Sequence, residues 1–344
     1  MDKRILLFSS DAKTLYKGDV FRALALPMDH TLQFRYPRKY VLGEYRDNPK
    51  SLRGRDGVII FLSGNDTSKP EVERKLERHP IRECLILDAF SDPESEQVIL
   101  ILRLGLFVNC MVEDITDPRS LPPSIFLTET NVSDLRKTGW LVAVKSVEEW
   151  FPATLFYQIS QVRRGEKVIG PSYSEELRLS QYSLREETDY YIECTYYDCG
   201  SNGAPLKIDV SAEAALDVSK LFEFGGGAEG DTKRLPLKTR TLKVRSAPVY
   251  MRFHSVVLQG SPPQSECNDP NYVEIHFQLI QNPWKPWQFG ALTGVGAFGL
   301  LIAQSGFKDS VGNYLDWTNV LWGIVGAVIM GTVAGLLFRL FNKI

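Results

Sequence analysis

The chain has 344 residues, of which 44% are hydrophobic, 24% charged and 11% aromatic, and its formal net charge is −2. These fractions exclude collagen-like, coiled-coil and wholly disordered proteins, and the balanced charge gives no overall signal for a nucleic-acid partner. Four histidines and five irregularly spaced cysteines argue against a metal-rich protein and a secreted disulfide scaffold. We therefore predict no metal, no cofactor and a reducing compartment.

The first 145 residues combine strand and helix signals and predict an α+β domain. Short apolar runs predict strands at 3–8, 57–62 and 84–87. The charged segment 71–79 follows Pro70, a residue suited to a first helical turn, and predicts a helix. A strand, a helix and a strand within about thirty residues are typical of a βαβ unit. The run 91–105 carries both helix and strand signals, and its structure stays open.

Residues 146–281 show short alternating runs divided by Gly, Pro, Asn and Ser. In the run 272–280, apolar residues from Val273 to Leu279 alternate with polar residues such as Glu274 and His276. Such runs, at spacings typical of an antiparallel sandwich, predict a middle β-sandwich domain. The other runs are 156–162, 175–180, 189–197, 206–210, 241–245 and 249–257.

Two stretches without a charged residue, 286–307 and 317–338, lie near the C-terminus, and each has 22 residues. A helix rising about 1.5 Å per residue needs roughly 20 residues to cross the hydrocarbon layer. Tryptophans flank both stretches, and Lys285, Arg339 and Lys343 lie outside them, which argues against two helices buried in a water-soluble core. We predict a C-terminal two-helix transmembrane hairpin in the inner membrane, with both termini in the cytoplasm.

Small residues recur within both stretches, and small side chains let helix backbones approach closely. The predicted packing positions are Gly290, Gly294, Gly323, Ala327, Gly331 and Gly335. They suit packing within one hairpin or assembly of several hairpins into a homo-oligomeric ring, and we favour the ring. Polar or small residues of the first stretch share one side and predict pore-facing positions at Thr293, Ala297 and Gln304.

Two basic segments predict an anion-binding surface. The segment 34–40 interleaves basic and aromatic residues, and no acidic residue lies between Asp231 and Glu266. This composition suits the phosphates and bases of a nucleotide or oligonucleotide, whereas a solvated surface and contact with anionic lipids are the alternatives. The predicted ligand-binding residues are Arg35, Arg38, Lys39, Lys238, Arg240, Lys243 and Arg245.

The sequence contains no motif that predicts a catalytic residue. The glycine-rich segment 225–230 is not followed by a helix signal, which a dinucleotide site needs. Ser9, Asp11, Ser63 and Asp66 follow two predicted strands, where α/β sheets often bind ligands. No histidine or glutamate partner can be assigned to them, so an enzyme remains an unsupported alternative.

The order of these parts, a head followed by a membrane hairpin, resembles the membrane-disrupting effectors of bacterial antiphage defence, some of which are gated by nucleotides or oligonucleotides. The resemblance is one of layout and carries over no residue. It implies a non-enzymatic pore of several copies in a lipid bilayer, gated by an anionic ligand on the cytosolic head. The alternatives are an adaptor that uses the hairpin as a passive anchor, and a membrane-bound enzyme that uses the N-terminal domain.

Overall fold

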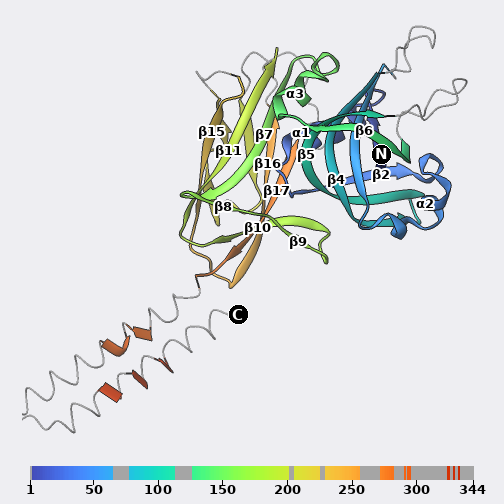
Figure 1. Cartoon of the computed structure of the whole chain (residues 1–344). Coiled ribbons are helices and arrows are strands. Elements are labelled where there is room, and N and C mark those ends of the chain that lie inside the picture. The colour runs from blue at the N-terminus through green and yellow to red at the C-terminus, as the bar shows by residue number, and fades with distance from the viewer. Residues whose placement is uncertain are drawn as a thin grey trace, which may run out of the picture. The chain divides into compact units, whose positions relative to one another are not determined.

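A computed structural model of the whole chain is shown in Figure 1. The residues that it describes are 2–64, 77–112, 126–200, 205–224, 229–255, 272–282, 290–291, 293–295, 324–325, 328–329 and 332–333. The chain divides into two compact units. The first comprises Met1–Ser183, Asp189–Lys238 and Val249–Phe277, and the second comprises Leu184–Thr188, Thr239–Pro248 and Gln278–Ile344.

The N-terminal sheet of the first unit closes on itself. Its strands are β1 (Asp2–Ser10), β2 (Thr31–Pro37), β3 (Asp56–Ser63), β4 (Glu77–Asp92), β5 (Gln97–Val112) and β6 (Phe126–Lys137). The strand order is β2-β5-β4-β3-β1-β6, and β5 also pairs with β6, so every strand except β2 belongs to a closed ring. Strands β1 and β3 are parallel. Apolar side chains fill the core of this ring, namely Leu6, Phe8, Val58, Ile60, Leu62, Val108 and Val132.

Strand β5 has two neighbours on the same side of its length. Its residues 97–103 pair antiparallel with β2, whereas residues 108–112 pair antiparallel with β6. The register between β5 and β6 shifts between Asn109 and Met111, and the register between β4 and β5 shifts twice. Because bulges bend a strand and increase its twist, they let β5 continue from one neighbour to the next.

Two further sheets contain the strands of the middle part of the chain. One has the order β14-β12-β16-β17-β10-β9 and the other has the order β13-β15-β11-β7-β8. The first consists of β9 (Ser172–Ser174), β10 (Leu179–Arg185), β12 (Leu206–Val210), β14 (Leu221–Phe222), β16 (Ser246–Ser255) and β17 (Val273–Ile280). The second consists of β7 (Thr154–Arg164), β8 (Lys167–Ile169), β11 (Asp189–Cys199), β13 (Leu216–Val218) and β15 (Thr232–Thr239).

These two sheets share an apolar core. The buried Tyr157 of β7 donates a hydrogen bond from its hydroxyl to the carbonyl of Phe253 on β16 at 3.0 Å. The alternation predicted for β17 is confirmed between Val273 and Leu279, because the apolar positions there are buried and the polar positions are half-buried on the opposite face. The face of β17 that carries Glu274 and His276 is therefore free to contribute to a site outside this core.

Helices are short and few in the described part of the chain. Before residue 283 they are α1 (Thr14–Ala25), α2 (Gly43–Asp47) and α3 (Trp140–Lys145), with 3-10 turns η1 (Arg38–Tyr40), η2 (Pro49–Leu52) and η4 (Glu148–Trp150). Helix α1 buries Phe21, whose ring centroid lies 5.9 Å from that of Phe156 and 5.4 Å from that of Tyr157 on β7. The opposite face of α1 carries Asp19 and Arg22, which are only partly buried.

Arg82 of β4 holds the C-terminal end of α1. The side chain is 1% exposed, and its Nη1 donates to the carbonyls of Ala23 at 2.8 Å and Leu26 at 2.7 Å. Its Nε donates to the carbonyl of Gly105 at 2.8 Å. The last carbonyls of a helix lack partners within the helix and carry a partial negative charge, so a cation is favourable there. Burial lowers the pKa of Arg82 to about 9, which leaves the group charged at neutral pH.

In the second unit, the carboxylate of Glu186 joins three segments. Glu186 is 2% exposed and accepts hydrogen bonds from the backbone N–H groups of Leu242 at 2.8 Å and Asn282 at 3.0 Å. The N–H of Glu186 donates to the carbonyl of Ile280 at 3.0 Å. The chain that leaves β17 is thereby fixed to the segments 184–188 and 239–248 before it continues toward the C-terminus.

The predicted transmembrane hairpin is contradicted by the structure. Among the described residues, no helix is both long enough and apolar enough to cross a membrane. Within 286–307 and 317–338 the structure describes short helical pieces, and the remainder of both ranges lies outside the described residues. The predictions of a multi-pass inner-membrane protein, a channel and a pore depended on this hairpin and are contradicted for the same reason. They rested on the absence of charged residues, which a membrane helix requires but which does not by itself establish one.

The predicted α+β class is also wrong, because the described chain is mostly β. Strands β3 and β4 pair antiparallel, with Ile60 opposite Pro80 and Ser63 opposite Glu77, so they do not form the expected βαβ unit. The C-terminal part of the predicted helix 71–79 belongs to β4, and its residues 71–76 lie outside the described part. Pairing with the buried strand β3 outweighs the local helix propensity of charged residues here. The open run near 97–105 forms β5.

Candidate functional site

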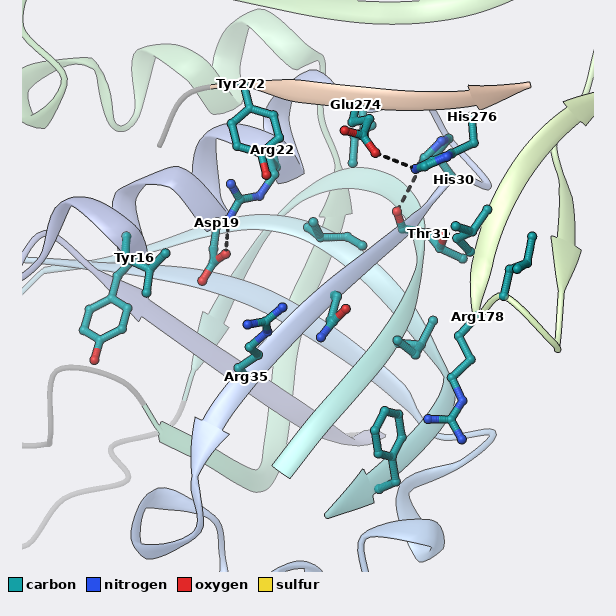
Figure 2. Close-up of a pocket in the computed structure, with 18 of the residues that line it drawn as sticks. Tyr16, Asp19, Arg22, His30, Thr31, Arg35, Arg178, Tyr272, Glu274 and His276 are labelled. Atoms are coloured by element: carbon teal, nitrogen blue, oxygen red, sulfur yellow. Dashed lines mark hydrogen bonds and ion pairs between the residues drawn. The ribbon is translucent and has the colours of Figure 1, made fainter. Parts of the chain in front are cut away.

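A cavity of about 820 Å³ lies in the first unit (Figure 2). Its volume falls within the roughly 300–1,000 Å³ of typical small-molecule sites. Helix α1, strands β2, β4, β5 and β17, and the loop between β9 and β10 supply its walls. The charged and aromatic residues that line it are Tyr16, Asp19, Arg22, His30, Arg35, Phe90, Arg178, Tyr272, Glu274 and His276.

The register of the N-terminal sheet builds the floor of this cavity. Arg35 of β2 is opposite Ile99 of β5, and Ile99 is opposite Phe90 of β4. Gln33 is opposite Ile101 in the same way. Directly opposite residues of antiparallel strands share a face, so these side chains stand on one surface of the sheet. The floor therefore presents a cation on β2, an apolar strip on β5 and an aromatic ring on β4.

Helix α1 supplies an ion pair to one wall. Asp19 and Arg22 are three residues apart, which places them on the same face of a helix, and Nη2 of Arg22 lies 2.5 Å from Oδ1 of Asp19. Burial raises the pKa of Asp19, and the nearby guanidinium groups of Arg22 and Arg35 partly oppose this effect. Figure 2 shows Asp19 and Arg35 facing the same part of the cavity.

The loop between β9 and β10 supplies Arg178 to another wall. The backbone of Arg178 has a φ of 52°, a left-handed conformation that residues other than glycine and asparagine rarely adopt. Its guanidinium carbon lies 3.9 Å from the ring centroid of Phe90, and its Nε lies 3.4 Å from Oδ2 of Asp88. The N–H of Ser180 donates to Oγ1 of Thr31 at 2.7 Å, which fixes the start of β10 to β2. The contacts with Phe90 and Asp88 hold the guanidinium of Arg178 over the floor, and the hydrogen bond of Ser180 fixes the backbone that follows it.

Strand β17 closes the cavity with a hydrogen-bonded network. Oε1 of Glu274 lies 2.9 Å from Nε2 of His276, and Oε2 of Glu274 accepts hydrogen bonds from Arg252 at 2.7 and 3.1 Å. Burial disfavours the charge of Glu274, but the hydrogen bonds from His276 and Arg252 hold its pKa below the ordinary value. The alternation in the sequence places His276 on the polar side of its strand, and the structure shows that this side forms part of the cavity wall.

His30 contributes a buried hydrogen-bond acceptor. It is 3% exposed, and its Nδ1 lies 2.9 Å from the carbonyl oxygen of Thr31, so this nitrogen carries the proton. Burial lowers the pKa of His30 to about 4, which keeps the imidazole neutral at pH 7. Its Nε2 therefore is an acceptor, and it has no hydrogen-bond partner among the described residues. This nitrogen is buried, so a ligand in the cavity does not contact it in this structure.

The buried His30 predicts an acid-dependent loss of stability. The unfolded chain takes up a proton at His30 near pH 6.5, whereas the folded protein does so near pH 4, so stability falls as pH decreases between these values. The integrated contribution is about 3 kcal/mol. We expect His30→Asn, which keeps the hydrogen bond to Thr31, to reduce this part of the pH dependence in urea unfolding. An unchanged profile between pH 6.5 and 4 would contradict this role of His30.

The predicted ligand-binding residues fall in different places. Arg35 lines the cavity, whereas Arg38 and Lys39 lie in the exposed turn η1. Nη2 of Arg38 lies 3.9 Å from Oδ1 of Asp47, and Nζ of Lys39 lies 4.8 Å from the ring centroid of Tyr40.

The second basic segment does not line this cavity. Nζ of Lys238 is 3.8 Å from Oδ1 of Asp189 at the end of β15. In the second unit, Arg240, Lys243 and Arg245 are exposed. The predicted strand 241–245 is irregular instead, because Leu242 is held by the carboxylate of Glu186. An anion-binding role for these four residues remains a prediction.

Most of the predicted packing and pore-facing positions lie outside the described residues. These are Gly323, Ala327, Gly331, Gly335, Ala297 and Gln304. Gly290 and Gly294 are described, helical and buried, and Thr293 between them is half-buried. The predicted homo-oligomer remains a prediction.

Sequence reasoning missed Arg22, Arg178 and His30. The spacing of Asp19 and Arg22 on the polar face of a short helix is a local signal that could have indicated Arg22. For Arg178 the sequence predicted a strand over 175–180, but Glu175–Arg178 form the turn between β9 and β10. His30 precedes a strand that was not predicted, so its burial had no signal in the sequence pattern.

Of the four residues considered for an enzyme, Ser63 has a histidine partner, His79, that the sequence did not reveal. Oγ of Ser63 lies 3.0 Å from Nε2 of His79, and Oδ2 of Asp11 accepts a hydrogen bond from the N–H of Gly64 at 2.9 Å. Ser63 is 0% exposed, and Ser9 donates its hydroxyl proton to the carbonyl of Tyr16. Since a nucleophile must reach its substrate, we interpret the contact between Ser63 and His79 as structural. Asp66 lies outside the described residues.

No protein-family model matches the chain, and no curated protein matches it significantly. The resemblance in layout to antiphage effectors is not tested by these comparisons and stays a prediction. A function for the protein therefore has to be inferred from the chemistry of the cavity itself.

Proposed function

We propose that this protein binds a small phosphorylated organic molecule of nucleotide size in the cavity. The observation that carries the proposal is that three arginines, Arg22, Arg35 and Arg178, from a helix, a strand and a loop, line one cavity with two carboxylates. Arg35 makes no hydrogen bond or ion pair with any described residue. An unpaired guanidinium in a cavity wall is suited to a bidentate contact with phosphate or carboxylate.

The other walls favour an organic ligand over a free inorganic ion. Tyr16 and Tyr272 provide aromatic surface, and Leu32, Leu179 and Ile101 provide apolar surface. A nucleotide carries an anionic phosphate and an aromatic ring in one molecule, and it therefore matches both the arginines and the aromatic and apolar walls.

Isothermal titration calorimetry of the full chain with four probes tests the proposal. We expect adenosine monophosphate to bind more tightly than ribose 5-phosphate and inorganic phosphate, and adenosine without phosphate to bind most weakly. Affinity should fall with increasing salt, because charge attraction is screened. If none of the phosphate compounds binds, or if adenosine binds as tightly as the monophosphate, the proposal is wrong.

Asp19→Asn should increase the affinity for a phosphate ligand. Asp19 neutralises Arg22 at 2.5 Å and repels an anion in the cavity. At the effective dielectric of partly buried sites, one charge several ångström away is worth about 1–2 kcal/mol, which corresponds to roughly a tenfold change in Kd. Since burial raises the pKa of Asp19, the advantage of the variant should shrink as the pH is lowered and the wild-type carboxyl is protonated.

A matched control for this change is Asp47→Asn. The carboxylate of Asp47 is also next to an arginine, but it is 69% exposed and lies in α2, away from the cavity-lining residues. We expect its removal to leave Kd within about twofold, because exposed charges are screened by solvent. Equal effects of both variants would show that net charge alone sets the affinity.

A further inference from the structure

We infer that the ligand carries two anionic groups separated by an uncharged part, one bound by Arg22 and Arg35 and the other by Arg178. The inference rests on the proposed function and specifies its ligand class. It follows from the positions of these arginines in the cavity lining, where Figure 2 shows Arg35 and Arg178 on opposite sides.

The separation of the two cationic positions comes from strand pairing. Arg35 of β2 is opposite Ile99 of β5, which is opposite Phe90 of β4, so two inter-strand steps separate Arg35 from Phe90. At about 4.8 Å per step, the backbones of Arg35 and Phe90 are roughly 10 Å apart. The guanidinium of Arg178 lies over the ring of Phe90 at 3.9 Å. Two anionic groups on one ligand can therefore bind at separate positions, one at Arg35 and one at Arg178.

The surface between the two positions is apolar. Ile101 of β5 lines the cavity between β2 and β4, and Leu179 lies beside Arg178 in the lining. Burying a polar or charged linker against such side chains costs free energy without a hydrogen bond. An uncharged ring or chain that connects two anionic groups fits this strip.

Arg178 is built to present its guanidinium to the cavity. Its left-handed backbone, with a φ of 52°, costs about 1 kcal/mol or more and is maintained by the surrounding structure. Nε faces Asp88, and the ring of Phe90 covers one face of the guanidinium. The two terminal amino groups make no hydrogen bond with a described residue and are available for a second anion.

The affinities of bisphosphates of different length test whether the ligand carries two anionic groups. The probes are α,ω-alkane bisphosphates of increasing chain length, each compared by calorimetry with the alkyl monophosphate of the same length. We expect the bisphosphate to bind roughly tenfold or more tightly than its monophosphate partner when its phosphates are about 10 Å apart, and less so at shorter lengths. Arg178→Gln should reduce the affinity of the best bisphosphate to the level of its monophosphate.

A second variant keeps the test valid if Arg178→Gln alters the loop. Asp88→Asn keeps an amide oxygen that can accept a hydrogen bond from Nε of Arg178, and it removes the negative charge 3.4 Å from that nitrogen, so it should strengthen binding of the bisphosphate by several-fold more than binding of the monophosphate. If monophosphates bind but a second phosphate adds no affinity at any length, the two-anion inference is wrong and the proposed function stands. If neither series binds, the proposed function itself is wrong.

Discussion

Replacing Arg35 with glutamate is expected to weaken binding of a phosphate ligand by about 100-fold or more. The change removes a guanidinium on the cavity floor that has no ion pair among the described residues, and it puts a negative charge in its place. The reversal of charge removes one attraction and adds one repulsion; with each discounted for solvent screening to about 1.4 kcal/mol, the two together correspond to about 100-fold in Kd. Calorimetry with adenosine monophosphate measures the effect.

Two companion variants separate site chemistry from net charge. Lys39→Glu makes the same change in charge four residues away, in the exposed turn η1, and should change Kd by about twofold at most. Arg35→Lys keeps the charge but loses the planar, two-pronged donor, and should fall between wild type and Arg35→Glu. Because Arg35 is exposed, each variant should unfold at nearly the wild-type urea concentration. Equal losses in Lys39→Glu and Arg35→Glu would contradict a site at the cavity floor.

Replacing Arg82 with methionine is expected to lower the free energy of unfolding by about 3–5 kcal/mol. The side chain is 1% exposed and donates to three backbone carbonyls, of Ala23, Leu26 and Gly105. Methionine preserves much of the apolar contact but leaves these buried acceptors without a donor, and each unsatisfied group costs about 1–3 kcal/mol. Urea unfolding, followed by circular dichroism, measures the loss.

The control for Arg82 is Arg136→Met. Arg136 of β6 is 79% exposed, and its ion pair with Asp134 at 3.9 Å is open to solvent. Its replacement should change the free energy of unfolding by about 0.5 kcal/mol or less. If Arg82→Met is as mild as Arg136→Met, then the hydrogen bonds at the end of α1 do not hold that helix in place.

Alternation was the most informative pattern in the sequence. It identified β17 and the buried side of that strand, because a strand with one face in a core must alternate apolar and polar residues. The strands at 3–8 and 57–62 were also found, as continuous apolar runs. Pairing partners had no local signal, so β3 and β4 were placed in a parallel unit although they are antiparallel neighbours.

The cavity was only partly foreseeable. Arg35 was found because it lies in a run that mixes basic and aromatic residues, but the same run also suggested Arg38 and Lys39, which turn away into η1. Arg22 and Arg178 are far apart in the sequence and come to line the same cavity only when the sheets fold. The C-terminal prediction failed for a different reason, since lack of charge is required for a membrane helix but does not by itself produce one.

The double pairing of β5 has a consequence for how the floor of the cavity fluctuates. Residues 97–103, beneath the ligand position, and residues 108–112, in the closed ring, belong to one uninterrupted strand. Opening the floor would break hydrogen bonds of the same strand that secures the ring, so both should exchange their amide hydrogens in one cooperative event rather than separately. The floor then meets an incoming molecule already ordered, and little conformational entropy is lost there when the complex forms.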